Sequence, residues 1–298
     1  MTKFYIIGNG FDLAHNMPTR FDPNFKDIAE RLEDSYFWDL YQTQKENIWS
    51  DFEYLLGCPD YSTLEDIFNG YEPDYLSDRE SDRDGIIYQV ELSGNLKEAL
   101  DEFAWKAEKS LERVKKNPFI NQILDKDSYF LSFNYTHTLE AIYDVPDENV
   151  LHVHGEVGAD NLALGYPQGS FTPEKYSYDV IQKGSGTYVQ MEIEDYINQI
   201  EDYYVRTAYE ELVEKCESFY KEIRTDLLAD FLDKNNCNID EIIVYGHSCA
   251  IDYEYFDLLI KRYPSAHWCF YVKGDEQEYN TKCLIVEYGI NNYQIVIL

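Results

Sequence analysis

The chain has 298 residues, and its 25 Lys and Arg stand against 57 Asp and Glu, for a formal net charge of -32. Hydrophobic residues make up 44% and aromatic residues 16%, which excludes a disordered chain and allows a large core. The negative charge repels nucleic-acid backbones and anionic lipids, which argues against DNA, RNA and membrane-surface binding. A small nucleotide is still compatible, because backbone N–H groups can offset phosphate charge locally.

The six cysteines form no C-x-x-C pair and no spacing typical of a tetrahedral zinc site. We interpret them as reduced core thiols and expect no metal. No apolar run approaches the about 20 residues that span a bilayer, and no leader sequence precedes the first apolar run. These observations favour a cytoplasmic protein.

Short, nearly continuous apolar runs recur along the chain and predict strands of a sheet that is covered on both faces. They lie at 4–7, 129–131, 151–153, 242–245, 268–272 and 293–297. Helical stretches separate them, so right-handed crossovers can make the sheet mostly parallel. The predicted fold class is therefore α/β, a mostly parallel, three-layer Rossmann-like sheet with large helical insertions.

Two stretches between the predicted strands are too long for simple crossovers, at 21–126 and 171–238. Both are rich in Glu, Asp, Lys and Tyr, and we interpret them as helical insertions in a single α/β domain spanning 1–298. Apolar residues spaced by three or four predict helical faces at 93–116 and 193–223. Two segments have the loop-forming composition expected of a lid, 69–85 and 168–186.

The first polar cluster is a glycine turn directly after the first predicted strand, Gly8-Asn9-Gly10-Phe11-Asp12. Gly8 and Gly10 lack Cβ atoms, so a ligand can approach the backbone there. The full dinucleotide fingerprint is not met, because Leu13 stands where the third glycine would. A plain tight turn is the alternative, since Asn9 between two glycines is also common turn chemistry.

Two further clusters follow predicted strands. In the first, the carboxamide of Asn134 can donate to and accept from one ligand, whereas Thr136 or Thr138 suits the N-cap of a helix at 139–143. In the second, His152 suits a satisfied core histidine, and His154, followed by Gly155, faces the strand end. A metal shared by these two histidines is the alternative, but the surrounding sequence shows no pattern that completes a ligand set.

The fourth cluster contains Gly246, His247, Ser248 and Asp252, again after a strand. It partly matches the G-x-S-x-G elbow of α/β hydrolases, which would need Asp257 and His267 as triad partners. His267 lies at the start of a strand, the wrong end for that role. All four clusters follow strands, so they should converge on the carboxyl edge of the sheet, where such sheets bind ligands.

These four motifs, in this order, resemble the AbiH abortive-infection family of bacterial antiphage proteins. The resemblance extends from Phe4 to about Asp252 and includes Trp49 and Glu53. That family is distantly similar to sirtuin-type NAD-binding domains, with the glycine turn, Asn134, His154 and the 246–248 motif in the corresponding places. Asp12 and His247 depart from the sirtuin pattern, and the zinc module of protein-deacylating sirtuins is absent, so the resemblance does not extend to acyl-lysine removal.

The resemblance implies a sirtuin-like fold and an antiphage protein that binds NAD and cleaves its nicotinamide glycosidic bond. It implies binding through the four motifs, catalytic roles for His154 and Asn134, and stabilisation of positive charge by Asp12. NAD would be substrate or ligand, with no metal. The alternatives are a nucleotide sensor without catalysis, which acts through a protein partner or a second copy bound to the helical insertions, and a Ser248 hydrolase.

Overall fold

We describe the protein from a computed structural model. The described residues are 2–32, 38, 41, 49, 52–57, 87, 95–167, 178–181, 188–191, 193–235 and 238–298. The predicted lid segment 69–85 lies outside them, and of segment 168–186 only 178–181 is described, as a strand. No helix within the described ranges is long and apolar enough to cross a membrane.

Contacts divide the chain into two compact units. The first contains residues 1–25, 99–163 and 223–298, and the second contains 26–98 and 164–222. Most residues of the second unit therefore come from the two stretches in which we expected insertions, at 21–126 and 171–238. That all of 1–298 behaves as a single domain stays a prediction.

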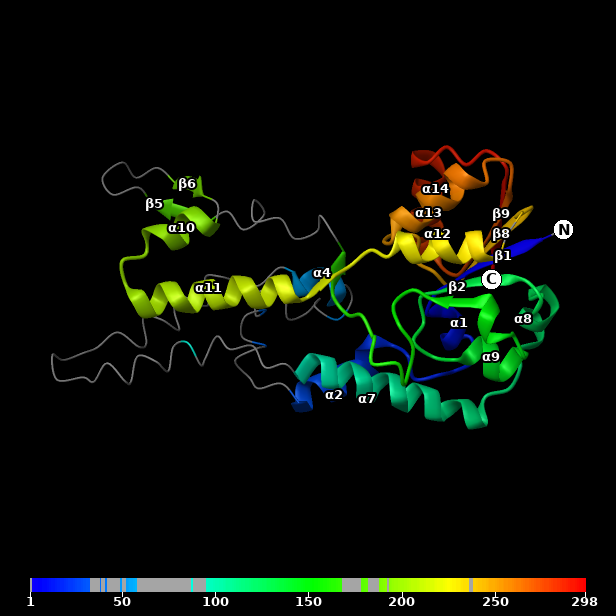
Figure 1. Ribbon diagram of the computed structural model, residues 1–298, viewed down its shortest axis with the longest axis horizontal. Helices are drawn as coiled ribbons and strands as arrows, with labels where there is room; N and C mark the ends of the chain where they lie inside the picture. Colours follow the sequence, from blue (N-terminus) through cyan, green and yellow to red (C-terminus); the bar gives the residue numbers. More distant parts are fainter. Residues whose placement is uncertain are drawn as a thin grey trace. The chain divides into compact units, whose positions relative to one another are not determined.

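The first unit is built on a six-stranded parallel sheet (Figure 1). Its strands are β1 (Lys3–Ile7), β2 (Tyr129–Ser132), β3 (Val150–His152), β8 (Glu241–Tyr245), β9 (His267–Val272) and β10 (Tyr293–Ile297). The spatial order is β10-β9-β8-β1-β2-β3. Counted in chain order this is 3-2-1-4-5-6, the doubly wound order of dinucleotide-binding folds, whose ligand crevice lies where the order reverses, here between β1 and β8.

Successive side chains of β1 point to opposite faces of the sheet and enter two separate cores. Phe4 and Ile6 pack with helices from the C-terminal part of the chain, whereas Tyr5 and Ile7 pack with helices near the N-terminus and on either side of β2 in the sequence. All four are at most 2% exposed. Full burial stabilises each such side chain by about 1.5–3 kcal/mol, so the near-continuous apolar run specifies a strand covered on both faces.

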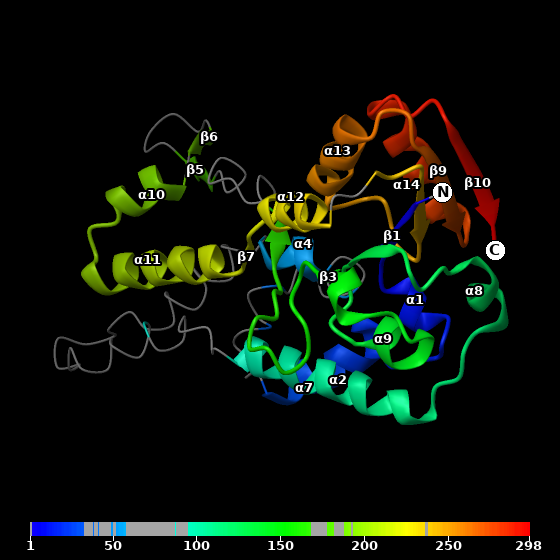
Figure 2. The same ribbon diagram turned by 45° about the vertical axis from the view of Figure 1, so that its right-hand side comes forward.

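Helices form the layers on both sides of the sheet (Figure 2). One face carries α12 (Thr225–Lys234), α13 (Tyr253–Arg262) and α14 (Asp275–Glu287), and the other carries α1 (Gly10–Leu13), α8 (Pro118–Ile123) and α9 (Thr138–Tyr143). The first unit also contains the π-helix η1 (Phe21–Phe25), most of α7 (Asn95–Ser110), and the short 3-10 helices η3 (Leu111–Arg113) and η4 (Asp147–Asn149). The predicted mostly parallel, three-layer Rossmann-like fold is confirmed.

The second unit has small sheets and helices of its own. Its described elements are α2 (Lys26–Leu32), α4 (Phe52–Leu56), β4 (Tyr166–Pro167), β5 (Tyr178–Ile181), β6 (Tyr188–Met191), α10 (Ile193–Gln199), α11 (Tyr203–Ser218) and β7 (Tyr220–Lys221). β4 pairs with β7 in parallel, and β5 pairs with β6 antiparallel. The buried ammonium of Lys221 lies 3.2 Å from a carboxylate oxygen of Glu53, so this unit contains an ion pair in its interior.

Two sequence predictions need correction. The helical face at 193–223 is broken into α10 and α11, because Asp202 accepts the backbone N–H groups of Tyr204 and Val205 and so starts a new helix. Among the described cysteine side chains, Cys249 and Cys269 are buried thiols, but Cys283 is exposed on α14 and is not a core residue. By contrast, the helix predicted at 93–116 is present as α7 and η3.

Candidate functional site

The loops after β1 and β8 pack backbone against backbone at the reversal point of the sheet. A Cβ on Gly8 would lie 2.6 Å from the Gly246 oxygen, and one on Gly10 would lie 2.6 Å from the Gly246 Cα. Gly246 itself has φ +72°, and its Cβ would lie 2.4 Å from the Phe11 nitrogen. The three glycines are therefore required by contact between two loops that lie far apart in the sequence.

Hydrogen bonds inside the protein occupy much of the glycine turn. The N–H groups of Gly8, Gly10 and Phe11 donate to the oxygens of Tyr245, Gly246 and Gly8. The side chain of Asn9 donates to the Thr19 oxygen at 2.7 Å, and Phe11 is a core residue. A phosphate at this turn would thus have to bind through groups other than these three amides.

Asp12 lies on α1 with its carboxyl group buried beside the loop after β2. The hydroxyl of Thr136 donates to Asp12 Oδ2 at 2.5 Å, and Thr136 also contacts the hydroxyl of Thr138 at 3.0 Å. Burial raises the pKa of Asp12 to about 6, although hydrogen bonds from Thr136, Thr138 and Asn134 act in the opposite direction. Asp12 Oδ1 has no hydrogen-bond partner within the described residues.

The two threonines do not cap α9, so that interpretation was wrong. The helix begins at Thr138, and His137 precedes it without a side-chain capping bond. The threonine hydroxyls bind the Asp12 carboxyl group and each other instead, because a hydrogen bond to a carboxylate is stronger than one to a backbone amide. Asn134, also buried, lies near the same cluster, since its carboxamide acts to lower the pKa of Asp12.

His154, Asp252 and His247 form a buried array at the carboxyl edge of the sheet. His154 Nε2 lies 3.5 Å from Asp252 Oδ1, and His247 Nε2 lies 3.5 Å from Asp252 Oδ2. Their side chains are 4–7% exposed. The ring of Phe133 packs against both histidines, with centroid distances of 5.0 and 4.6 Å. The second, third and fourth motifs therefore meet at one place.

The backbone of this array is held in unusual conformations. Gly246, Cys249 and Asp252 all have positive φ, of 72°, 57° and 61°. Such angles are costly for residues other than glycine and gather at functional sites. Gly155, after His154, also has positive φ, and a Cβ there would lie 2.2 Å from the Asn161 oxygen. The turn after His154 is thus as constrained as the loop after β8.

The hydrogen bonds fix the tautomer of His247. Burial lowers the pKa of His247, whereas the hydrogen bond and charge of Asp252 act to raise it. A doubly protonated ring, however, does not fit the backbone N–H of Cys249, which donates to His247 Nδ1 at 3.1 Å and so needs a bare nitrogen there. We therefore assign the neutral ring with its proton on Nε2, facing Asp252.

A cleft of about 1250 Å³ lies beside the array, at the ends of β8, β9 and β10. Of the predicted site residues, Gly10, Gly246 and Ser248 line it, whereas Asn134 and His154 do not. Arg20 and Lys273 supply positive charge to its wall, and Asp275 and Glu276 supply negative charge. A second hollow of about 750 Å³, which shares Ala14, Asn16 and Asn117 with the cleft, is lined by Lys106, Lys109, Arg113 and Lys115.

The residues of a serine-hydrolase triad do not come together. Ser248 follows the carboxyl end of β8, whereas His267 begins β9 and pairs in register with Glu241 at the opposite end of β8. Asp257 pairs with Lys261 at 2.6 Å on the surface of α13. The Ser248 elbow therefore lacks its predicted partners.

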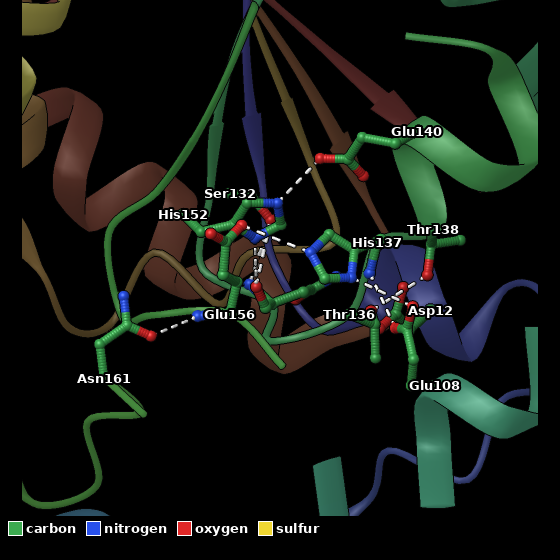
Figure 3. Close-up of polar contacts among 11 residues, drawn as sticks. Asp12, Glu108, Ser132, Thr136, His137, Thr138, Glu140, His152, Glu156 and Asn161 are labelled. Carbon is green, nitrogen blue, oxygen red and sulfur yellow. Dashed lines mark hydrogen bonds and ion pairs between the residues drawn. The ribbon is translucent and has the colours of Figure 1, made fainter. Parts of the chain in front are cut away.

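A second polar cluster, which we did not predict from the sequence, lies next to Asp12 (Figure 3). His137 lies between Glu108 of α7 and Glu156, and His152 contacts Glu140 of α9. The sequence did offer one signal, since Glu140 is one helical turn after His137 and Glu156 is four residues after His152. Glu108 could not be found this way, because only the packing of α7 brings it to His137.

Comparison with protein families matches residues 4–272 to the family described as "Bacteriophage abortive infection AbiH". The chain belongs to the AbiH family. The match covers all four motifs and ends at the last residue of β9. A search of the curated proteins found no match. Membership makes this AbiH protein an antiphage abortive-infection protein.

Proposed function

We propose that this AbiH protein binds a nucleotide, with NAD as the leading candidate, and cleaves its nicotinamide glycosidic bond. The proposal rests above all on the array of His154, Asp252 and His247, which joins three motifs at the reversal point of a dinucleotide-binding strand order. A histidine held by a buried carboxylate is an arrangement suited to general base catalysis.

In this reaction the bond between C1′ of the ribose and the nicotinamide nitrogen breaks, and neutral nicotinamide leaves with the bonding electrons. Water adds to C1′, and His154 takes the proton that the water loses. Asp252 holds the ring of His154 and stabilises its positive charge. Asp12, whose Oδ1 has no hydrogen-bond partner in the described part of the chain, offers negative charge to the oxocarbenium-like ribose, and Asn134 orients the sugar.

The first prediction concerns the array itself. We expect His154→Ala and Asp252→Asn to lower nicotinamide release from NAD by at least about 100-fold, since general base catalysis typically contributes 10²–10⁴-fold. The measurement is nicotinamide release by the purified full-length protein, alone and from phage-infected cells. Asp257→Asn is the matched control, because it removes a partly exposed carboxylate of α13 that pairs with Lys261 on the surface.

Plaque formation on cells that carry the same variants adds a biological readout. Protection should fall with His154→Ala and Asp252→Asn and persist with Asp257→Asn. Equal nicotinamide release by all four proteins, or none by any of them under either condition, would overturn the catalytic proposal.

A nucleotide sensor without catalysis is the second candidate, and a specific observation favours it. The cleft and the adjoining hollow gather Arg20, Lys273 and four further basic side chains within a protein of net charge -32. These positive charges suit the phosphates of a nucleotide that does not reach His154. A sensor would pass its signal to a protein partner or a second copy of the chain.

The second prediction separates binding from cleavage. Lys109→Glu combined with Arg113→Glu should weaken nucleotide binding at least tenfold, measured by calorimetry with NAD, because it reverses two charges at the hollow. Lys234→Glu, on the exposed surface of α12, is the control. Intact nucleotide recovered from the purified protein by mass spectrometry supports the sensor, whereas recovered cleavage product supports the enzyme.

A further inference from the structure

We propose that His137, His152 and Glu156 bind a divalent transition-metal ion, such as Zn²⁺, which ties the turn at His154 to the loop before α9. Each residue offers one ligand atom, and the three atoms lie within 4.8 Å of one another. Two imidazoles and one carboxylate are a ligand set typical of zinc and iron sites that keep positions open for water.

The distances fit this assignment. His137 Nε2 lies 3.4 Å from Glu156 Oε2. Two ligands of one tetrahedral ion, each about 2.1 Å from the metal, are separated by roughly the same distance. The rings of His137 and His152 have centroids 5.5 Å apart, and the three ligand atoms lie within 4.8 Å of one another, so the side chains must rotate inward to close the site around an ion.

The outer partners of both histidines are those that metal-binding histidines have. His137 Nδ1 lies 3.1 Å from Glu108 Oε1, and the other Glu108 oxygen accepts the backbone N–H of His137. His152 Nδ1 lies 2.9 Å from the backbone oxygen of Asn134. Because a carbonyl oxygen can only accept, this contact places the proton on Nδ1 of His152 and leaves Nε2 as the metal-binding atom.

The negatively charged groups around His152 favour binding of a cation. Its Nε2 lies 2.9 Å from Glu140 Oε1, which is favourable only if a proton or a metal ion lies on the nitrogen. The other Glu140 oxygen is buried and has no hydrogen-bond partner among the residues that the structure describes. Three carboxylates, Glu108, Glu140 and Glu156, surround the two rings, so a divalent ion would balance more of this charge than a proton.

The proposed ion has a defined structural role. His152 and Glu156 flank the turn that carries His154, and Glu156 N–H is fixed by the Asn161 side chain at 3.0 Å. A metal bound there and to His137 would fix that turn against the start of α9 (Figure 3). From the sequence we expected no metal, with a metal shared by His152 and His154 as the alternative. The proposed site pairs His152 with His137 instead.

Metal binding by the full chain tests this directly. Chelator-treated protein is titrated with Zn²⁺ by calorimetry and with Co²⁺ by visible absorption, in 0.3 M KCl to suppress binding to the acidic surface. We expect one site per chain. Glu156→Gln should weaken binding at least tenfold and the double variant His137→Gln, His152→Gln should abolish it. Glu108→Gln should weaken binding about 10–100-fold, as outer partners typically do.

Glu112→Gln, an exposed acid one turn after Glu108, is the control and should bind like wild type. Circular dichroism without metal checks that each variant folds, and Glu156, whose side chain is 42% exposed, is the variant least prone to misfold. Equal titrations for wild type and Glu156→Gln, or no binding by wild type in 0.3 M KCl, would overturn the proposal. Neither result depends on NAD cleavage.

Discussion

At the scale of single residues, Asp12 has a carboxyl group that folding places in an unfavourable environment. It is 1% exposed, and burial raises its pKa from 3.8 to about 6. Because the folded pKa lies above the unfolded one, the folded state binds the proton more tightly. The contribution of Asp12 to stability therefore decreases as the pH rises from about 4 to about 6.

The third prediction follows from this sign. Between pH 5 and pH 8, Asp12→Asn should gain roughly 1 kcal/mol of unfolding free energy relative to wild type. The reason is that the folded wild type loses the proton of Asp12 in this interval, whereas the unfolded chain has already lost most of it at pH 5. Urea unfolding at the two pH values measures the difference, with Asp257→Asn as the control. A difference that is the same at both pH values would contradict the raised pKa.

At the scale of elements, the contact between the loops after β1 and β8 depends on glycine at both sides. Gly246 combines a φ of +72° with a hypothetical Cβ 2.4 Å from the Phe11 nitrogen. Gly289, at the end of α14, has a similar φ of +63°, but a Cβ there would meet nothing within 4 Å. Substitution of Gly289 therefore introduces backbone strain alone, whereas substitution of Gly246 introduces backbone strain and steric overlap.

The fourth prediction uses this pair. Gly289→Ala should cost about 1 kcal/mol, which is the strain of a left-handed residue alone. Gly246→Ala should cost at least about 3 kcal/mol, because the two loops must also move apart. Thermal and urea unfolding give both values. Equal losses of stability in the two variants would contradict this prediction. They would show that the two loops separate easily and that glycine is needed at position 246 only for its positive φ.

At the scale of the whole molecule, the net charge of -32 opposes folding through self-repulsion. The fifth prediction is that raising KCl from 0.05 to 0.5 M increases the melting temperature by several degrees, because the screening length falls from about 14 Å to about 4 Å. Differential scanning fluorimetry measures this. As a control, the melting temperature is also measured in sodium sulfate at the same ionic strengths as in KCl. A melting temperature that changes in neither salt would contradict the prediction.

The sequence by itself determined the layers, strands and family of this protein. Runs such as 4–7 and 242–245 are apolar throughout, and their shortness together with their Ile, Val, Tyr and Phe content indicates strands buried on both faces. The clusters after these strands identify the carboxyl edge, because the chain direction of a parallel sheet fixes which strand ends share an edge. The AbiH family could be recognised because its motifs occur in order.

Only the tertiary structure decided which of these residues meet. Gly8 and Gly10 are glycines because of Gly246, more than 230 positions away, and the hydroxyl of Thr136 serves Asp12 rather than a helix end. His152 neighbours His137 instead of His154. Local spacing encodes which side of a strand or helix is buried, whereas the partner across a loop contact depends on packing between distant segments, which no spacing records.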